Sequence, residues 1–329
     1  MYYTIYMKKP ARSILLAALT LCLAGAAHSA DKAEVRSRIA NVQNAIRSGG
    51  ARWVAGETSV SGLTGEEWRG LAGLNFEPFE GSPAPEVSTK GLQPALDWRK
   101  AGGNFVTSPK NQEKCGSCWA FAMTGGLESY VLRTQNRPGE NLDLSEQVML
   151  SCSGVGNCGG GILFPRFLAK TGLPAESAYP YTQSKGPCES AAPGWERSVY
   201  KIANWGFVWD TVGQLKAALA HYGPLPTSMR VYEDFMDYKS GVYSYTTGKS
   251  LGGHAVLLVG YDDAEQCFIV KNSWGTGWGE DGFFRIDYSE LRTRVLFGLV
   301  TVAYYPDEAK ASGIERKSPL LDQAETLFK

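Results

Sequence analysis

The chain has 329 residues, of which 43% are hydrophobic, with 33 basic and 33 acidic side chains. This length allows one large domain or two moderate ones, and the hydrophobic content is that of an ordinary globular protein. The balanced charge gives no reason to expect nucleic acid or an anionic membrane as a partner.

The first thirty residues have the pattern of an export signal. Lys8, Lys9 and Arg12 precede the apolar run ILLAALTLCLAGAA, and small residues continue to Ala30. The run is too short to span a bilayer comfortably, so we expect no membrane association after residues 1–30 are removed. We therefore expect an exported monomer, periplasmic or extracellular, in an oxidising compartment where disulfides persist.

Residues 31–91 differ in composition from the chain that follows. Apolar residues recur at helical spacing and stop before Gly49-Gly50, which predicts one helix. These residues are Val35, Ile39, Val42 and Ile46. The next stretch, ARWVAGETSVSGLTGEEWRGLAGL, has no strand pattern, and EPFEGSPAPEVSTKGLQP has the composition of a linker. Residues 31–91 are either a small subdomain or a removable propeptide with its linker.

A helical half precedes a strand-rich half, which predicts an α+β fold. Helices are expected within 118–133, 143–150, 164–172 and 211–223, with Ser117, Ser145 and Thr211 as N-caps. Strands are expected within 198–209, 254–262, 267–274, 282–288 and 295–305. Residues 307–329 form a polar, charged tail.

Six cysteines follow the export signal, and an even count is compatible with three disulfides in fifteen possible connectivities. They are residues 115, 118, 152, 158, 188 and 267. The motif NQEKCGSCWAFA could hold a redox pair, or a disulfide cysteine beside a catalytic thiol. A zinc site would need a second C-x-x-C, which the sequence lacks, so we predict no metal and no cofactor.

A histidine and an asparagine are expected to meet across a hairpin. His254 opens the strand HAVLLVGYD, and CFIVKNSW is the next strand. If the turn is centred near Asp263 and Ala264, His254 lies opposite Asn272 or Ser273. An asparagine carbonyl can hold an imidazole N–H and fix its orientation.

Cys118 has the sequence position of an activated nucleophile. At the start of a helix, a thiolate is stabilised by the helix dipole and by free backbone N–H groups, and a neighbouring imidazolium would lower its pKa further. Gln112 lies on the approaching loop, where its amide and the Cys118 N–H could stabilise an oxyanion.

Five motifs in order then resemble the papain/cathepsin family of cysteine peptidases. They are NQEKCGSCWAF, LSEQVMLSC with NCGGG, YPY, GGHAVLLVGY and VKNSWGTGWGEDGFFRI. The resemblance covers residues 92–306. It implies a helical left domain and a β-barrel-like right domain, with the active site in the cleft between them.

The resemblance also implies the site residues. Cys118 would be the nucleophile, His254 the general base and acid, Asn272 the residue that orients it, and Gln112 an oxyanion donor. The implied substrate-binding residues are Gly160, Gly161, Ile162, Leu163, Ser228, Gly253, Trp274 and Val302. The implied disulfides are Cys115–Cys158 and Cys152–Cys188, which would leave Cys267 as a free, buried thiol.

Substrate preference follows from the same resemblance. Val302 at the floor of the pocket for the second residue before the cleaved bond (P2) implies hydrophobic residues there, with arginine disfavoured. The N-terminal part is similar to a short cathepsin B-like prosegment, although Ala72 replaces a cysteine and cathepsin B's occluding loop has no room. We therefore expect an endopeptidase zymogen that acts on polypeptides and is inhibited by its own propeptide.

Two other functions are compatible with parts of this sequence. An inactive papain-like binding protein is the first, because Glu113 stands where the family has glycine. A thiol-disulfide oxidoreductase using Cys115 and Cys118 is the second. It would have tryptophan before the first cysteine, where Lys114 stands, and it leaves His254 without a role.

Overall fold

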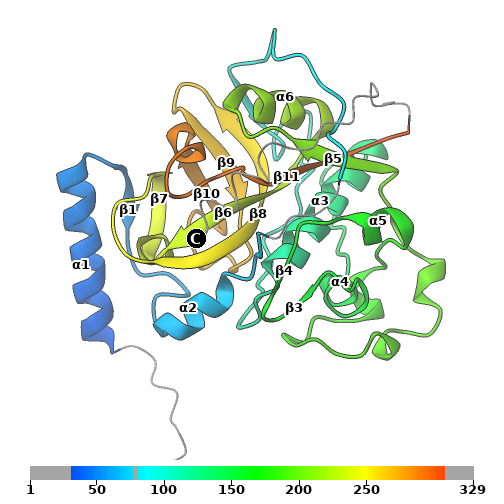
Figure 1. The fold of residues 1–329 in the computed structure, drawn as a ribbon, viewed down its shortest axis with the longest axis horizontal. Coiled ribbons are helices and arrows are strands. Elements are labelled where there is room, and N and C mark those ends of the chain that lie inside the picture. Colours follow the sequence, from blue (N-terminus) through cyan, green and yellow to red (C-terminus); the bar gives the residue numbers. More distant parts are fainter. Residues whose placement is uncertain (1–30, 77–80, 308–329) are drawn as a thin grey trace, which may run out of the picture.

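The computed structural model describes residues 31–76 and 81–307, so the predicted export signal and nearly all of the predicted tail lie outside it. A helical half packs beside a sheet half, and the described part of residues 31–91, here called the N-terminal segment, lies against both (Figure 1). Among the described helices, none combines the length and hydropathy needed to cross a membrane.

The helices are α1 (Lys32–Gly49), α2 (Gly65–Leu71), α3 (Cys118–Thr134), α4 (Glu146–Cys152), α5 (Arg166–Lys170) and α6 (Val212–Tyr222). The strands are β1 (Arg52–Ala55), β2 (Ala95–Asp97), β3 (Gly156–Asn157), β4 (Gly160–Gly161), β5 (Asn204–Val208), β6 (Leu225–Tyr232), β7 (Tyr238–Tyr243), β8 (Ser250–Asp262), β9 (Cys267–Lys271), β10 (Phe283–Asp287) and β11 (Thr301–Tyr305). The expected α+β class is confirmed.

The larger sheet has the order β1-β7-β10-β9-β8-β6-β11-β5, and β2 pairs with β8. In the described part of the chain it is an open sheet with edges at β1 and β5 and does not close into a barrel. β1 lies in a stretch for which no strand was predicted, and that prediction was wrong. Its alternation of exposed and buried residues spans only Arg52 to Ala55, which is too short to detect without its partner β7.

The predicted register of the β8–β9 hairpin was also wrong. The ladder pairs Leu257 with Lys271 and Leu258 with Val270, and an irregularity follows before Gly260. Next to the turn, Asp262 pairs with Cys267, so the turn is centred between Ala264 and Glu265 rather than near Asp263 and Ala264, and the pairing differs from the prediction by one to three positions. Asn272 nevertheless reaches His254, because it follows the last paired residue of β9.

Helix α3 runs through the boundary between the two halves, and close packing explains its inner glycine. A Cβ atom at Gly126 would lie 2.7 Å from Pro226 and 2.9 Å from Tyr304, so no larger residue fits there without movement. Ser117 occupies the N-cap position but makes no capping hydrogen bond. Its hydroxyl instead pairs with the Tyr181 hydroxyl at 2.7 Å, so that part of the prediction was wrong.

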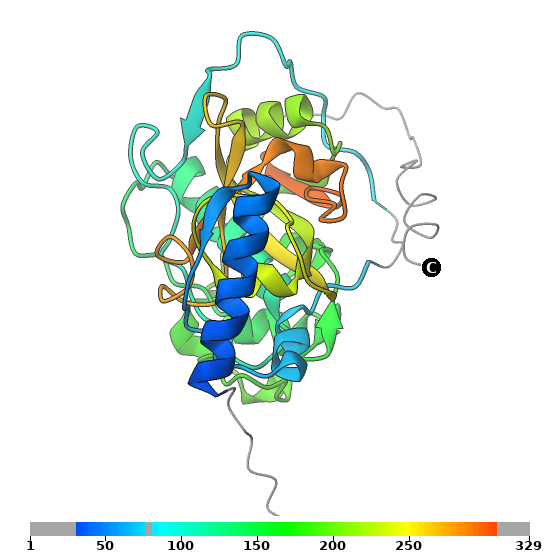
Figure 2. The same cartoon turned by 90° about the vertical axis from the view of Figure 1, so that its left-hand side faces the viewer.

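Helix α1 lies along one end of the sheet (Figure 2). Its four predicted apolar residues are all buried in the core of the sheet half. Arg38 adds an ion pair to the buried Asp237 at 2.9 Å, and the Ser61 hydroxyl binds the same carboxylate at 2.6 Å. The helix is therefore docked by both its apolar face and a charged contact.

Candidate active site

Cys118 begins α3 and is completely buried between the two halves. Its Sγ accepts a hydrogen bond from the Ala255 N–H at 3.4 Å, which ties the thiol to the start of β8. Helix α3 presents its N-terminus at this point, where its dipole favours a negative charge. The thiol therefore lies at the contact between the helical half and the sheet half.

His254 precedes Ala255 and is fixed by Asn272. Its Nε2 lies 2.8 Å from Asn272 Oδ1, and that oxygen also accepts the Ser273 N–H at 2.9 Å. Because this oxygen accepts the Ser273 N–H, the Asn272 amide is oriented with Oδ1 toward the ring, and Nε2 must carry the proton. Nδ1 of the neutral ring is then the unprotonated nitrogen.

Trp274 covers the histidine. The two rings have centroids 4.8 Å apart and are inclined by 32°, and the tryptophan is buried. A bond that water cannot reach is electrostatically stronger than an exposed one. Trp274 therefore shields the His254–Asn272 contact.

Gln112 is buried, and three contacts fix its amide. Ser273 Oγ donates to Oε1 at 2.7 Å, which directs Nε2 toward backbone carbonyls. Nε2 donates to the Cys115 carbonyl at 2.8 Å and to the Leu71 carbonyl at 3.2 Å. Tyr181 adds a hydrogen bond from its hydroxyl to the Gln112 carbonyl at 2.8 Å. Ser273 and Tyr181 were not predicted as site residues, although they stand in the motifs VKNSWGTGWGEDGFFRI and YPY.

The N-terminal segment crosses this site. The Leu74 N–H donates to the Gly253 carbonyl at 2.9 Å. Gly161 receives the Asn75 N–H at 2.8 Å and donates its own N–H to the Gly73 carbonyl at 2.9 Å. These bonds place Leu74 between Gly161 and Gly253, so one residue of the segment is held by both halves.

Burial changes the acidity of both candidate catalytic groups. Burial raises the pKa of the Cys118 thiol to about 11, although backbone N–H groups of Ala255 and Gly73 oppose the change. Burial lowers the pKa of His254 to about 4, while the hydrogen bond to Asn272 opposes it. In the intact chain the pair is therefore a neutral thiol and a neutral imidazole at pH 7.

The remaining predicted site residues fall into two groups. Gly160, Gly161 and Gly253 contact the N-terminal segment, and a Cβ at Gly160 would lie 2.7 Å from the Asn75 side chain. Leu163, Ser228 and Val302 are buried, and Ile162 is half-buried. The Ser228 hydroxyl accepts the Val300 N–H at 2.8 Å, so it is used within the sheet half.

The cysteines form the two pairs that the resemblance implies. Disulfides join Cys115 to Cys158 and Cys152 to Cys188, and Cys118 and Cys267 are free and buried. With Cys115 bonded to Cys158, no redox pair with Cys118 exists in this structure. This contradicts the oxidoreductase alternative.

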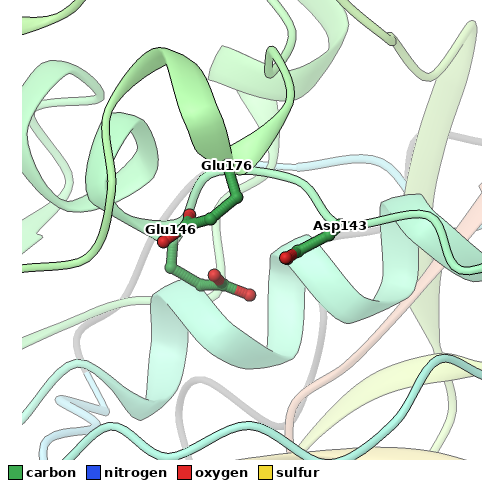
Figure 3. A group of neighbouring side chains, drawn as sticks. All are labelled: Asp143, Glu146 and Glu176. Carbon is green, nitrogen blue, oxygen red and sulfur yellow. The ribbon is translucent and has the colours of Figure 1, made fainter.

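A group of acidic residues lies behind the site. Asp143, Glu146 and Glu176 have carboxylate oxygens within 4.8 Å of one another (Figure 3). The Lys110 ammonium lies 2.6 Å from Asp143 and 2.8 Å from Glu146, and nearby carboxylates keep its pKa raised despite burial. Lysine therefore supplies the positive charge that this group requires.

This fold and this site define a cysteine peptidase whose cleft is covered by its own N-terminal segment. Residues 92–299 match the profile described as "Papain family cysteine protease", so the chain belongs to the papain family.

Similar proteins of known name agree with this family assignment. The chain is 36% identical over 271 residues to "Cathepsin B-like CP3" of Giardia intestinalis, covering 74% of this chain and 86% of that protein. It is 36% identical over 221 residues to "Pro-cathepsin H" of Medicago truncatula, covering 64% of this chain and 60% of that protein. The alignments span between 58% and 64% of the length of the first three curated relatives.

Solved structures of proforms match as well. The digestive procathepsin L 3 of Tenebrio molitor larval midgut has a TM-score of 0.70 and 26% identity, covering 83% of this chain and 90% of that chain. Procathepsin B S9 from Trypanosoma congolense has a TM-score of 0.72 and 22% identity, covering 82% of this chain and 98% of that chain. At this identity the match shows a shared fold and nothing more. Together with the family match, the Tenebrio molitor proform supports a papain-family zymogen.

Proposed function

We propose that the chain is an exported endopeptidase zymogen that hydrolyses peptide bonds through an acyl-enzyme on Cys118. The observation that carries this proposal is the arrangement of three residues. Asn272 holds His254 through Nε2, which leaves Nδ1 as the base, and the neighbouring Ala255 N–H binds the Cys118 thiol. A thiol beside an oriented imidazole is the arrangement that nucleophilic catalysis requires.

The steps follow from these groups. His254 Nδ1 takes the Cys118 proton, the thiolate attacks the carbonyl carbon of the peptide bond, and the imidazolium then protonates the leaving amine. Water, activated by the same imidazole, hydrolyses the thioester and restores the thiol. Gln112 Nε2 and the Cys118 N–H stabilise the oxyanion of each tetrahedral intermediate.

The Leu71 carbonyl supports this role for Gln112. In the zymogen it accepts a hydrogen bond from Gln112 Nε2 at 3.2 Å, in the place where a substrate oxyanion would bind. Processing frees this donor.

Chain direction explains why the N-terminal segment inhibits the enzyme without being a substrate. It contacts Trp274 through the Ser59 hydroxyl, and it pairs with Gly161 further along, at Leu74. A substrate binds its acyl part along Gly161 and its leaving part beside Trp274. The segment therefore runs in the opposite direction, and its pairing with Gly161 is parallel.

The occupant of the cleft also supports a hydrophobic P2 preference. Leu74 is buried and belongs to the apolar cluster that contains Ala255 and Val302. A substrate residue held between Gly161 and Gly253 would place its side chain against this cluster. Burying a leucine or phenylalanine there contributes roughly 2 kcal/mol.

Export is proposed from the sequence of residues 1–30, and the two disulfides fit an oxidising compartment. Propeptide and linker are proposed to end near residue 91, and the peptidase domain to span residues 92–306. We propose that the enzyme acts as a monomer on polypeptides.

The experiment is hydrolysis of a fluorogenic peptide with leucine at P2 by the processed chain in reductant, beside the Cys118→Ala variant. Turnover that disappears in the variant supports the proposal. Equal and negligible turnover from both folded proteins would refute it and favour the inactive binding protein. That alternative has one observation behind it, the positive φ of 52° at Glu113, next to the oxyanion donor.

A further inference from the structure

Arg230 is a charged residue in a strand that is otherwise buried. Every other residue of β6, from Leu225 to Tyr232, is buried, and Arg230 is half-buried. A charged side chain in such a strand must reach water or an opposite charge. The pairing of β6 with β8 shows on which face of the sheet Arg230 lies.

The register of the sheet directs Arg230 toward the cleft. Arg230 lies directly opposite Gly253 in the antiparallel β6–β8 ladder. Side chains of directly opposed residues leave the same face of a sheet, with Cβ atoms about 5 Å apart. At Gly253 a Cβ would lie 2.4 Å from the Leu74 carbonyl oxygen and 2.5 Å from the Phe76 ring. The face that carries Arg230 is therefore the face covered by the N-terminal segment.

The same contacts identify the substrate position concerned. Leu74 is bridged to both Gly161 and Gly253, so these two backbones are opposite walls of a single residue position. In a substrate this is the residue that pairs with Gly161, namely P2. Arg230 is one strand beyond the Gly253 wall, on the same face of the sheet.

We propose that Arg230 is a specificity residue that favours glutamate at P2, in addition to the apolar residues that the inner pocket accepts. This inference rests on the proposed peptidase function. The two methylene groups of glutamate would contact the apolar wall, and its carboxylate would receive hydrogen bonds from the guanidinium. A basic P2 side chain is rejected by the same charge.

The test measures kcat/KM of the whole chain, after processing, on peptides that differ only at P2. Glutamine is the neutral isostere of glutamate, so the ratio of kcat/KM for the glutamate peptide to kcat/KM for the glutamine peptide measures the effect of the carboxylate charge. We expect glutamate to exceed glutamine about tenfold, as for one charge-assisted hydrogen bond. In Arg230→Gln the ratio should fall to about one, while the leucine peptide changes less than threefold, and Arg230→Lys should keep part of the preference.

Arg292→Gln is the matched control, because Arg292 is 65% exposed and pairs with Asp210. It should leave every ratio unchanged. A glutamate-to-glutamine ratio of one or less in the unsubstituted enzyme overturns the inference, even if Arg230→Gln fails to fold. The same ratio in Arg230→Gln as in the unsubstituted enzyme also overturns it. Absence of Cys118-dependent turnover of the leucine peptide would instead refute the proposed function.

Discussion

Gly73 is the position at which a single added carbon should release the N-terminal segment. A Cβ there would lie 2.0 Å from the Gly116 carbonyl oxygen and 2.4 Å from the Gly116 carbonyl carbon. Both are backbone atoms of the loop that leads to Cys118, so they cannot rotate away as a side chain would. In Gly73→Ala the segment must therefore move away from the cleft.

The size of the effect follows from the hydrogen bonds around Gly73. Three of them, of 2.8–2.9 Å, join residues 73–75 to Gly161 and Gly253. Each contributes about 1 kcal/mol net. Losing all three would weaken the closed state by about 3 kcal/mol, which is on the order of 100-fold in the equilibrium between covered and open cleft.

The assay is the rate at which iodoacetamide alkylates Cys118 in the intact chain, followed by mass spectrometry. Because the thiol is completely buried, alkylation requires the segment to open. We expect Gly73→Ala to react about 100-fold faster, in proportion to the open population. Gly62→Ala is the control, since a Cβ there has nothing within 4 Å. Equal rates for Gly73→Ala and Gly62→Ala would refute the reasoning.

Three further predictions concern the charges of the site and the docking of α1. Burial holds the Cys118 pKa at about 11 and the His254 pKa at about 4 in the intact chain. Removing the segment should lower the Cys118 pKa below the ordinary value of about 8.5 and raise the His254 pKa. The measurement is thiolate absorbance against pH, with the signal of Cys118→Ala subtracted. The same titration curve with and without the segment would show that the segment is not the cause. Asn272→Ala should lower kcat/KM of the processed enzyme by about tenfold to 100-fold, because one charge-assisted hydrogen bond to His254 is lost. If both kcat/KM and the pH–rate profile stay unchanged in this variant, Asn272 does not orient His254. Arg38→Ala should lower the free energy of unfolding in urea by about 3 kcal/mol, because Asp237 stays buried without its cation; adding Asp237→Asn should restore part of the loss, and no change in either variant would show that the ion pair is not needed.

Local patterns predicted much of the fold. Helix α1 was predicted from four apolar residues at helical spacing before Gly50, and Ser145 caps α4 by accepting the Val148 N–H. These features depend on interactions between residues close in the sequence, so a short stretch of sequence is enough to predict them. The hairpin prediction brought His254 and Asn272 together for the same reason, although its register was wrong because the turn is centred about one residue further along the chain.

Contacts between residues far apart in the sequence were decided only by the tertiary structure. Strand β1 exists because its partner β7 lies about 190 residues away in the sequence, beyond any local pattern. The Ser273 hydroxyl orients Gln112 across 161 residues, and the position of Arg230 opposite Gly253 depends on which strand pairs with β8. By itself the sequence determined which residue types carry the chemistry and the local elements that hold them. Their distances, and the covering of Cys118 by a distant segment of the same chain, were decided only by folding, because those contacts form between residues that chain order keeps apart.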